Sequence, residues 1–320
     1  MKREELAYQA AVMYYVNEET MSTIAHHLDV SRSTVSRLLR DARELGLVQI
    51  VLSPPQDAPS HEARELNRRF GVQAHVVPVP ASANSMRSSQ AVAGMAGVLV
   101  STLVEDHSSI GVAWGNTLSS LGAYLVPKRT SDSTVVQLNG AVNSRNVSLP
   151  YAGSIMDCFV ESFGCTPVHY PVPAFFDHPE TRTAMWRESS VQAVRDLQKH
   201  CDVAIFGVGT MHGTNVSHVY TGGFFDNDEL EDLDAAGVVG DICTVMMRAD
   251  GTWQDLAINQ RASGPTPDDL AKIPRRVCVV SDESKVTATL AALRAGVATD
   301  LVLSNRSAEA ILARLNPRHP

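Results

Sequence analysis

The sequence predicts two domains: a small helical domain, followed by a larger α/β domain with a mainly parallel sheet. The chain has 320 residues, more than one ordinary domain usually holds. Three short helical patterns fill the first fifty residues, whereas apolar strands alternate with helices from Ala74 onward. Such alternation is typical of a parallel sheet with helices on both faces.

The first two predicted helices are short and amphipathic. The first is expected to end near Asn17, and its apolar face comprises Leu6, Ala10, Met13 and Tyr14. The second follows Thr20, a residue type that caps helices, and its apolar face comprises Met21, Ala25 and Leu28. Asp29 then begins a three-residue turn, where aspartate tolerates the left-handed conformation.

The third predicted helix begins at the cap Ser31, ends at Gly46 and has two unlike faces. Its inward face comprises Val35, Leu38, Leu39 and Ala42. The other face carries arginines and hydroxyls, which suit base edges and phosphates in a major groove. A solvated surface helix is the alternative, but the tight turn and the small Ala25 favour a helix-turn-helix. The predicted DNA contacts are Ser31, Arg32, Ser33, Thr34, Ser36, Arg37 and Arg40.

The expected domain limits follow from these patterns. Residues 1–53 form the helix-turn-helix domain, 54–72 a linker with a short helix, and 73–320 the α/β domain. The linker begins with PPQDAP, because prolines break both helix and sheet.

Two features near the linker are also predicted. A strand of a small wing is expected where apolar residues alternate at Val48, Ile50 and Leu52. The linker helix, HEARELNRRFGV, carries one apolar face made of Ala63, Leu66 and Phe70. This face could pair with a second subunit or dock on the large domain, and the sequence leaves both options open.

Three predicted strands of the large domain, SIGVAW, DVAIF and RVCVV, are followed by polar or glycine-bearing turns. Ligands of open α/β sheets bind beyond the carboxyl ends of strands. Glycine permits close approach there, and amide, hydroxyl and ammonium groups can bind an anion. Each turn alone is common, but together they indicate one edge of the sheet. The candidates are Gly115, Asn116, Thr117, Gly209, Thr210 and Lys285.

Composition argues against several protein classes. Apolar residues make up 44% of the chain, yet no apolar run approaches the roughly 18 residues of a membrane span, so no membrane partner is expected. MKREELAYQA lacks the apolar core of a signal peptide, so we expect a cytoplasmic protein. A net charge of −8 requires any DNA contact to come from a local basic face.

Metal and cofactor motifs are not found in the sequence. The five cysteines are scattered singly and are interpreted as buried thiols, with neither a zinc site nor disulfides: Cys158, Cys165, Cys201, Cys243 and Cys278. GVGTMHG misplaces the glycines of a dinucleotide fingerprint, and there is no G-x-x-x-x-G-K-[ST] loop. No cofactor is therefore expected.

A succession of segments runs through nearly the whole chain: VSRSTVSRLL, GVAWGNTL, VVQLNGAV, DVAIFGVGT, GVVGDICTVMMRADG and AINQR. In this order they resemble the SorC-type family of bacterial transcriptional regulators, especially its deoxyribonucleoside-regulator (DeoR) branch. The resemblance implies a NagB/RpiA/CoA-transferase-like effector domain that binds sugar phosphates. It also implies dimers or tetramers on palindromic operators.

The resemblance also implies roles for individual residues. Asn116, Thr117 and Lys285 are similar to phosphate ligands, and Asp241 to a partner of sugar hydroxyls. Gly209 and Thr210 would border the site. Tyr151 lies on a segment that lines it in the family.

Asn139, with its neighbour Gly140 as a further candidate, is where the sequence departs from the DeoR branch. It aligns with a lysine that forms a Schiff base with the sugar in that branch. An amide cannot do this, because an imine needs a primary amine. We therefore expect non-covalent binding, and deoxyribose phosphate is not the expected ligand.

We expect a transcriptional regulator, most simply a repressor of a carbohydrate catabolic operon. Its expected partners are double-stranded operator DNA, a small phosphorylated sugar or a polyol, and further copies of the chain. The alternative is a sugar-phosphate isomerase or deaminase, which shares the large fold. Such an enzyme needs a placed acid/base pair, and Asp241 has no convincing second member. Loop or surface positions are predicted for His169, His178, His212 and His218.

Overall fold

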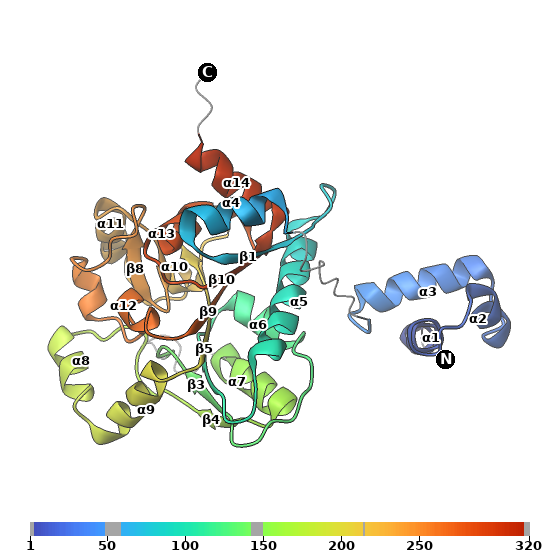
Figure 1. Cartoon of the computed structure of the whole chain (residues 1–320), viewed down its shortest axis with the longest axis horizontal. Helices are drawn as coiled ribbons and strands as arrows, with labels where there is room; N and C mark the ends of the chain where they lie inside the picture. The colour runs from blue at the N-terminus through green and yellow to red at the C-terminus, as the bar shows by residue number, and fades with distance from the viewer. Residues whose placement is uncertain (1–2, 49–58, 142–149, 214, 317–320) are drawn as a thin grey trace. The chain divides into compact units, whose positions relative to one another are not determined.

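A computed structural model describes residues 3–48, 59–141, 150–213 and 215–316 of the chain, without the side chains of residues 150–152. The chain divides into two compact units, Met1–Leu52 and Ser53–Pro320 (Figure 1). From residue 49 onward the predicted wing strand lies outside the described residues, as does nearly all of the proline-rich linker.

The small unit is a three-helix cluster. Its elements are α1 (Arg3–Ala11), continued by a π-helical turn (Val12–Val16), α2 (Met21–His27) and α3 (Arg32–Glu44). Its buried side chains are Ala7, Ala10, Ala11, Ile24, Ala25, Val35, Leu38, Leu39 and Ala42. The inner face predicted for α3 is therefore confirmed. On α1 and α2 the prediction was partly wrong, because small alanines let the helices approach and leave Leu6, Met13, Tyr14, Met21 and Leu28 at the edge of the core.

The predicted caps begin α2 and α3, and the predicted turn lies between these helices. Thr20 Oγ1 accepts a hydrogen bond from the Thr23 amide at 3.2 Å, and Ser31 Oγ accepts one from the Thr34 amide at 3.1 Å. Asp29 adopts a left-handed conformation, with φ of 51°. Each cap satisfies a backbone N–H at a helix start that has no partner within its helix.

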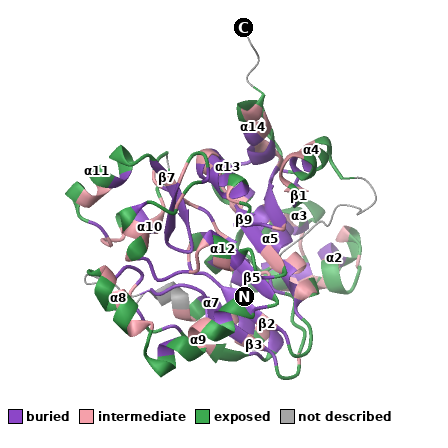
Figure 2. Cartoon of the chain, turned by 60° about the vertical axis from the view of Figure 1, so that its left-hand side comes forward, coloured by how far each residue is buried: buried purple, intermediate pink, exposed green. Residues whose placement is uncertain are grey.

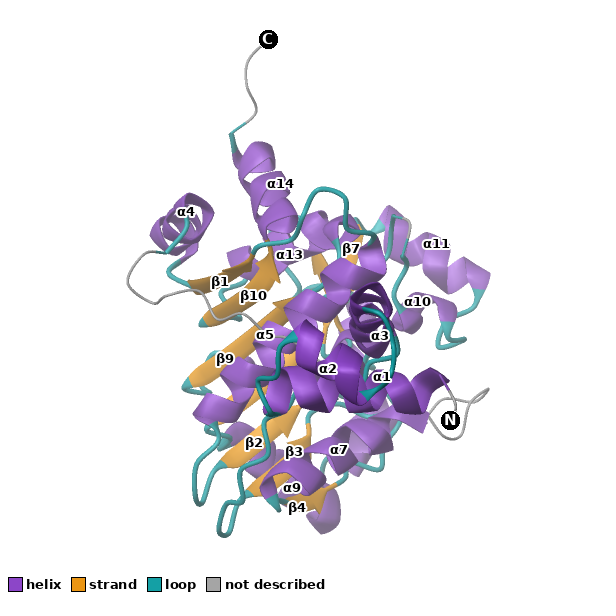
Figure 3. Ribbon diagram, turned by 90° about the vertical axis from the view of Figure 1, so that its right-hand side faces the viewer, coloured by secondary structure: helices purple, strands orange, loops and turns teal. Residues whose placement is uncertain are grey.

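The large unit is built on a seven-stranded parallel sheet in the order β1-β10-β9-β5-β2-β3-β4. Figure 3 shows the strands side by side between helices. The strands are β1 (Gln73–Val77), β2 (Ser109–Val112), β3 (Thr134–Gln137), β4 (Thr166–Val168), β5 (Val203–Gly207), β9 (Arg275–Val280) and β10 (Asp300–Ser304). The predicted mainly parallel α/β architecture is confirmed.

Helices cover both faces of this sheet, and alternate strand residues are buried on each side. Figure 2 shows that the strands are largely buried, whereas the outer helices carry the exposed residues. One face packs on α5 (Ser85–Leu103), α6 (Asn116–Gly122) and α7 (Pro150–Phe163). The other packs on α4 (His61–Phe70), α13 (Val286–Arg294) and α14 (Asn305–Leu315). Within the described residues, no helix is both long enough and apolar enough to cross a bilayer.

The linker helix α4 docks on the large unit, which answers a question that the sequence left open. Leu66 is fully buried with residues of α14 and β10, and Phe70 packs against the same cluster. The last helix, α14, begins at Asn305. The reason is that Ser304 is its cap and accepts a hydrogen bond from the Ser307 amide at 3.1 Å.

A three-stranded antiparallel sheet lies beside the main one: β6 (Gly209–Thr210), β7 (Val238–Ile242) and β8 (Val245–Arg248). Gly209 pairs with Asp241 in its register. The remaining elements are α8 (Pro179–Met185), α9 (Ser189–Lys199), α10 (His218–Thr221), α11 (Asn227–Ala235), α12 (Pro267–Leu270), and the 3-10 turns Ala257–Gln260 and Glu283–Lys285.

Candidate functional site

The outward ridge of the small unit is the predicted set Ser31, Arg32, Ser33, Thr34, Ser36, Arg37 and Arg40. Six of these side chains are exposed, and that of Thr34 is half-buried. Arg37 donates a hydrogen bond to Thr34 Oγ1 at 3.3 Å, and Arg40 lies 3.9 Å from the Glu44 carboxylate. Arg3 pairs with the acidic Asp41 at 2.8 Å. The ridge is therefore basic and is not packed into the body of its own unit.

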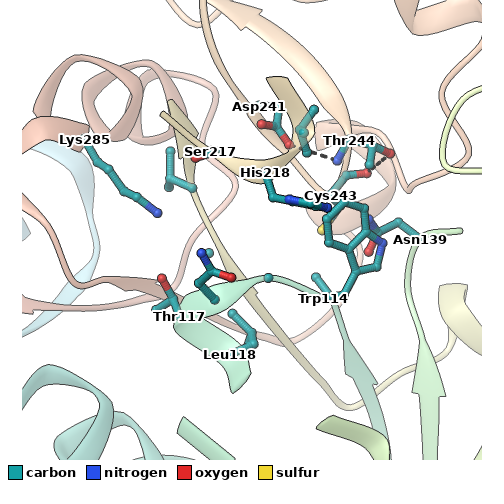
Figure 4. A pocket seen from close by; sticks show the side chains of 17 residues that line it. Trp114, Thr117, Leu118, Asn139, Ser217, His218, Asp241, Cys243, Thr244 and Lys285 are labelled. Carbon is teal, nitrogen blue, oxygen red and sulfur yellow. Dashed lines mark hydrogen bonds between the residues drawn. The ribbon is translucent and has the colours of Figure 1, made fainter. Parts of the chain in front are cut away.

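The large unit has a pocket where the carboxyl ends of four adjacent strands meet. The segments after β2, β3, β5 and β9 contribute to it, as the strand order requires. Figure 4 shows these side chains converging. The pocket holds about 560 Å³ of empty space, including solvent at its mouth.

Seven predicted effector residues line this pocket: Gly115, Asn116, Thr117, Asn139, Gly209, Asp241 and Lys285. Gly140 lies behind its wall, where its carbonyl accepts a hydrogen bond from Trp114 Nε1 at 2.7 Å. Thr210 also lies behind the wall, and its hydroxyl donates to the His212 carbonyl at 2.9 Å. The Tyr151 side chain lies outside the described part of the chain.

One end of the pocket is cationic. Lys285 follows β9, is half-buried, and its ammonium forms no hydrogen bond or ion pair with the described residues. Figure 4 shows it reaching toward the side that carries Thr117. The Thr117 hydroxyl lies 3.2 Å from that of Ser281. Burial lowers the pKa of Lys285, and the carboxylates of Asp241 and Asp282 partly oppose that shift.

The other end presents buried acceptors. Asn139 and Asp241 are only 2% and 4% exposed, and the Oδ1 atom of each has no hydrogen-bond partner in the described residues. Asp241 Oδ2 accepts from the Thr244 amide at 3.2 Å. Burial raises the pKa of Asp241 to about 6, while the Thr244 amide, the Lys285 charge and the nearby Tyr220 hydroxyl favour the ionised form. Buried acceptors without donors are costly, so this end is suited to a ligand that donates hydrogen bonds.

Gly209 is required by the position of the Asp241 carboxylate. A Cβ atom at residue 209 would lie 1.8 Å from Asp241 Oδ1. Only glycine at this position of β6 leaves room for the carboxylate on the paired strand β7 to point into the pocket. This explains on steric grounds why the predicted turn contains a glycine.

Three buried side chains position the segment that carries Asn139. Gln137 Nε2 donates to the Asn139 carbonyl at 2.8 Å. Gln198 Nε2 donates to the carbonyls of Gln137 and Leu138 at 2.8 and 3.2 Å. Ser263 Oγ accepts from the Gly140 amide at 3.0 Å. The main chain around Asn139 is thus held by a network that the sequence did not reveal.

An aromatic wall completes the pocket. Trp114 stacks on Phe224 with ring centroids 5.8 Å apart, and the ring of His218 stands edge-on to both. His218 was predicted as a loop or surface residue, and this was wrong, because α10 folds back and places it in the pocket lining. His169, His178 and His212 are exposed, as predicted.

Sequence reasoning missed several lining residues: Trp114, Leu118, Ser217, His218, Cys243 and Thr244. Trp114 ends a predicted strand and Thr244 follows Asp241 closely, so their positions could have indicated them. Ser217 and His218 lie in a segment without a regular pattern. The five cysteines are free thiols, four of them buried, and the described residues hold no cluster suited to a metal ion.

Known proteins share this organisation. The family model described as "Putative sugar-binding domain" matches residues 56–313, and the model for Sigma-70 region 4 matches residues 9–44. The deoxyribonucleoside regulator of Bacillus subtilis (strain 168) is 29% identical over 97% of this chain and 98% of its own length.

Two solved structures agree with the fold. A domain of a possible sugar-binding transcriptional regulator from Arthrobacter aurescens TC1 is 42% identical, with a TM-score of 0.74, over 81% of this chain and 99% of that chain. The full-length sorbitol operon regulator SorC from Klebsiella pneumoniae is 24% identical, with a TM-score of 0.69, over 97% of this chain and 99% of that chain. The chain therefore belongs to the sugar-binding-domain family and is a SorC-type bacterial transcriptional regulator with an N-terminal helix-turn-helix.

Proposed function

We propose that this regulator represses a carbohydrate catabolic operon and responds to a small phosphorylated sugar, or a related polyol, that binds without a covalent bond. In this proposal residues 1–53 read operator DNA in the cytoplasm, 54–72 connect, and 73–320 bind the effector. The observation that carries it is the polarity of the pocket: among the described residues, the cation at one end has no counterion and two buried acceptors at the other end have no donor.

The cationic end supports an anionic group on the ligand. An ammonium without a partner in a half-buried position gains from an oxyanion more than an exposed one does, because its attraction is less screened. The amide of Asn116 and the hydroxyl of Thr117 lie in the same wall and can add hydrogen bonds. A phosphate is the oxyanion that a sugar metabolite most often carries to such a site.

The acceptor end supports hydroxyls on the remainder of the ligand. Asp241 Oδ1 and Asn139 Oδ1 each lack a donor in the described residues, and sugar or polyol hydroxyls supply one. The amide of Asn139 cannot form an imine with an aldehyde. The complex should therefore form reversibly and resist trapping by borohydride.

The sensor proposal is tested by Lys285→Ala. We expect it to lower the affinity for phosphorylated sugars at least tenfold in calorimetry and to leave operator affinity unchanged, because a charge-assisted contact to phosphate is lost. Lys128→Ala, an exposed lysine, is the matched control. Undiminished sugar-phosphate affinity in Lys285→Ala would refute the assignment.

The DNA-reading proposal is tested by Arg37→Ala and Arg40→Ala in gel shifts with DNA that flanks the chromosomal locus. A side chain that reaches a base edge contributes roughly 1–3 kcal/mol, so each variant should bind about 5- to 150-fold more weakly. Arg187→Ala, an exposed arginine of the large unit, is the control. If both ridge variants bind like the wild type, the ridge does not read DNA.

Regulation in this proposal is a shift of population. The effector changes DNA binding only by its different affinities for the DNA-competent and DNA-incompetent arrangements. A dimer or tetramer would present two helix-turn-helix units to a palindromic operator. Sedimentation velocity with and without effector tests the assembly, and a monomer at operator-binding concentrations would contradict it.

A further inference from the structure

Two arginines flank one indole ring in the region of α8 and α9. The guanidinium carbon of Arg195 lies 3.5 Å from the ring centroid of Trp186, and that of Arg182 lies 3.8 Å from it. Both arginines are half-buried, and neither forms an ion pair with a described residue. Arg182 donates a hydrogen bond to the Asn259 carbonyl at 2.6 Å. Two like charges thus share one aromatic ring, which attracts each of them but supplies no negative charge.

Further hydrogen-bond donors surround this pair. The hydroxyl of Tyr170, a side chain only 1% exposed, adjoins the indole N–H of Trp186, and both atoms lack a hydrogen-bond partner in the described residues. Among the described residues, the Tyr170 hydroxyl hydrogen has no acceptor. Arg182 Nε is likewise buried without a partner in this part of the chain. The cluster therefore has a surplus of donors and of positive charge.

A second pocket opens beside Arg195. It holds about 330 Å³ of empty space, including solvent, and shares no lining residue with the effector pocket. Its wall also contains Lys199, the amide of Gln198 and the hydroxyl of Ser263. Gln198 and Ser263 are 6% and 3% exposed, and their side-chain donors are engaged by main-chain carbonyls of Gln137, Leu138 and Ala174.

One carboxylate, that of Asp269, also lines this pocket. Its two oxygens lie 3.1 Å from Lys272 Nζ and 2.8 Å from Thr266 Oγ1, so its charge is already engaged. Lys199 has Asp196 at 3.0 Å. Arg195 is consequently the lining residue whose positive charge has no counterion among the described groups.

We propose that this second pocket binds a small oxyanion, a phosphate or carboxylate group, held by the guanidinium of Arg195. Arginine offers a planar pair of N–H groups that matches the two oxygens of such an anion. The anion would neutralise the shared charge beside Trp186. The site is separate from the effector pocket, and its existence does not depend on the function proposed for Lys285.

The test uses inorganic phosphate as the probe and the full chain carrying Lys285→Ala, in which the cation of the effector pocket is absent. Calorimetry at constant ionic strength should still detect phosphate binding. Adding Arg195→Gln should weaken it at least tenfold, whereas Arg187→Gln, which removes a nearby exposed arginine, should change it less than twofold. Phosphate should also alter tryptophan fluorescence, and this change should vanish in Trp186→Phe.

Circular dichroism and the melting temperature of Arg195→Gln establish that the variant is folded. Arg195→Lys is a second variant, which keeps the charge and should retain part of the affinity. The proposal is overturned if the Lys285→Ala chain binds no phosphate, or if Arg195→Gln binds it equally well. It is also overturned if Arg195→Gln leaves phosphate binding intact but changes the sedimentation coefficient, since the arginine would then pair with a carboxylate of a second copy.

Discussion

Replacing Asp241 with asparagine should stabilise the large unit at neutral pH. Burial raises the pKa of this carboxyl from 3.8 to about 6, so the folded protein binds its proton more tightly than the unfolded chain does. Between these two pKa values the folded state therefore holds more protons, and stability falls as the pH rises. A shift of about two pKa units corresponds to roughly 3 kcal/mol of lost stability once the pH exceeds 6.

Asp241→Asn removes this ionisation cost and retains an oxygen for the Thr244 amide. We expect the stability difference between variant and wild type to grow by roughly 2 kcal/mol between pH 4.5 and pH 7.5. Urea unfolding, followed by the fluorescence of the large unit, measures it at both pH values. Titrating groups that do not interact with Asp241 cancel in the difference.

Asp250→Asn is the matched control. Asp250 is exposed, and hydrogen bonds from Thr252 hold the pKa of its carboxyl below 3.8, so its contribution is fully present above that pH. The difference for this control should not grow between pH 4.5 and pH 7.5. If the difference for Asp241→Asn is equally flat, Asp241 does not carry the burial cost inferred for it.

The remaining predictions concern the residues that shape the pocket. Gly209→Ala should destabilise the large unit by roughly 2 kcal/mol and reduce effector affinity, because its Cβ would lie 1.8 Å from Asp241 Oδ1. Thermal unfolding measures the stability and calorimetry the affinity. An unchanged affinity would mean that the Asp241 carboxylate does not contact the ligand. Gln198→Leu should cost roughly 1–3 kcal/mol, because it removes the donor to two buried carbonyls, and should also weaken effector binding through Asn139. Gln192→Leu, at an exposed position of α9, should change neither quantity, and equal effects of both variants would refute the positioning role.

The sequence predicted elements that are defined by local patterns. The predicted strand RVCVV lies within β9 (Arg275–Val280), because an apolar run between helices has few alternatives. The β7–β8 hairpin was not predicted as strands. Its turn places Cys243 and Thr244 at φ of 48° and 73°, a conformation for which neither residue type is a signal. Packing against α13 fixes this turn, and such packing cannot be read from a local window.

In the pocket, too, local patterns indicated some residues and missed others. Asn116, Thr117 and Lys285 were predicted to lie together because the ends of parallel strands meet at one edge of a sheet, and all three line the pocket. Asp241 and Asn139 were indicated only by the resemblance to the family, since β7 belongs to a second sheet and Asn139 follows β3 without a motif. His218 is placed by aromatic contacts with Trp114, which is distant in the sequence, and with Phe224, which lies in a segment without a regular hydrophobic pattern. Neither contact could be predicted from the local sequence.

The unpaired groups of the pocket also determine how its ligand can be identified. Asn139 Oδ1 and Asp241 Oδ1 lower the stability of the empty form, because each is buried without a donor among the described residues. A molecule that supplies hydroxyl donors and an oxyanion removes these costs only in the folded state, and so raises the melting temperature by mass action. A panel of sugar phosphates and matched polyols therefore ranks candidates directly. The phosphate contributes through Lys285 if the advantage of each sugar phosphate over its polyol disappears in Lys285→Ala, and equal rankings in both proteins would assign recognition to the hydroxyl end alone.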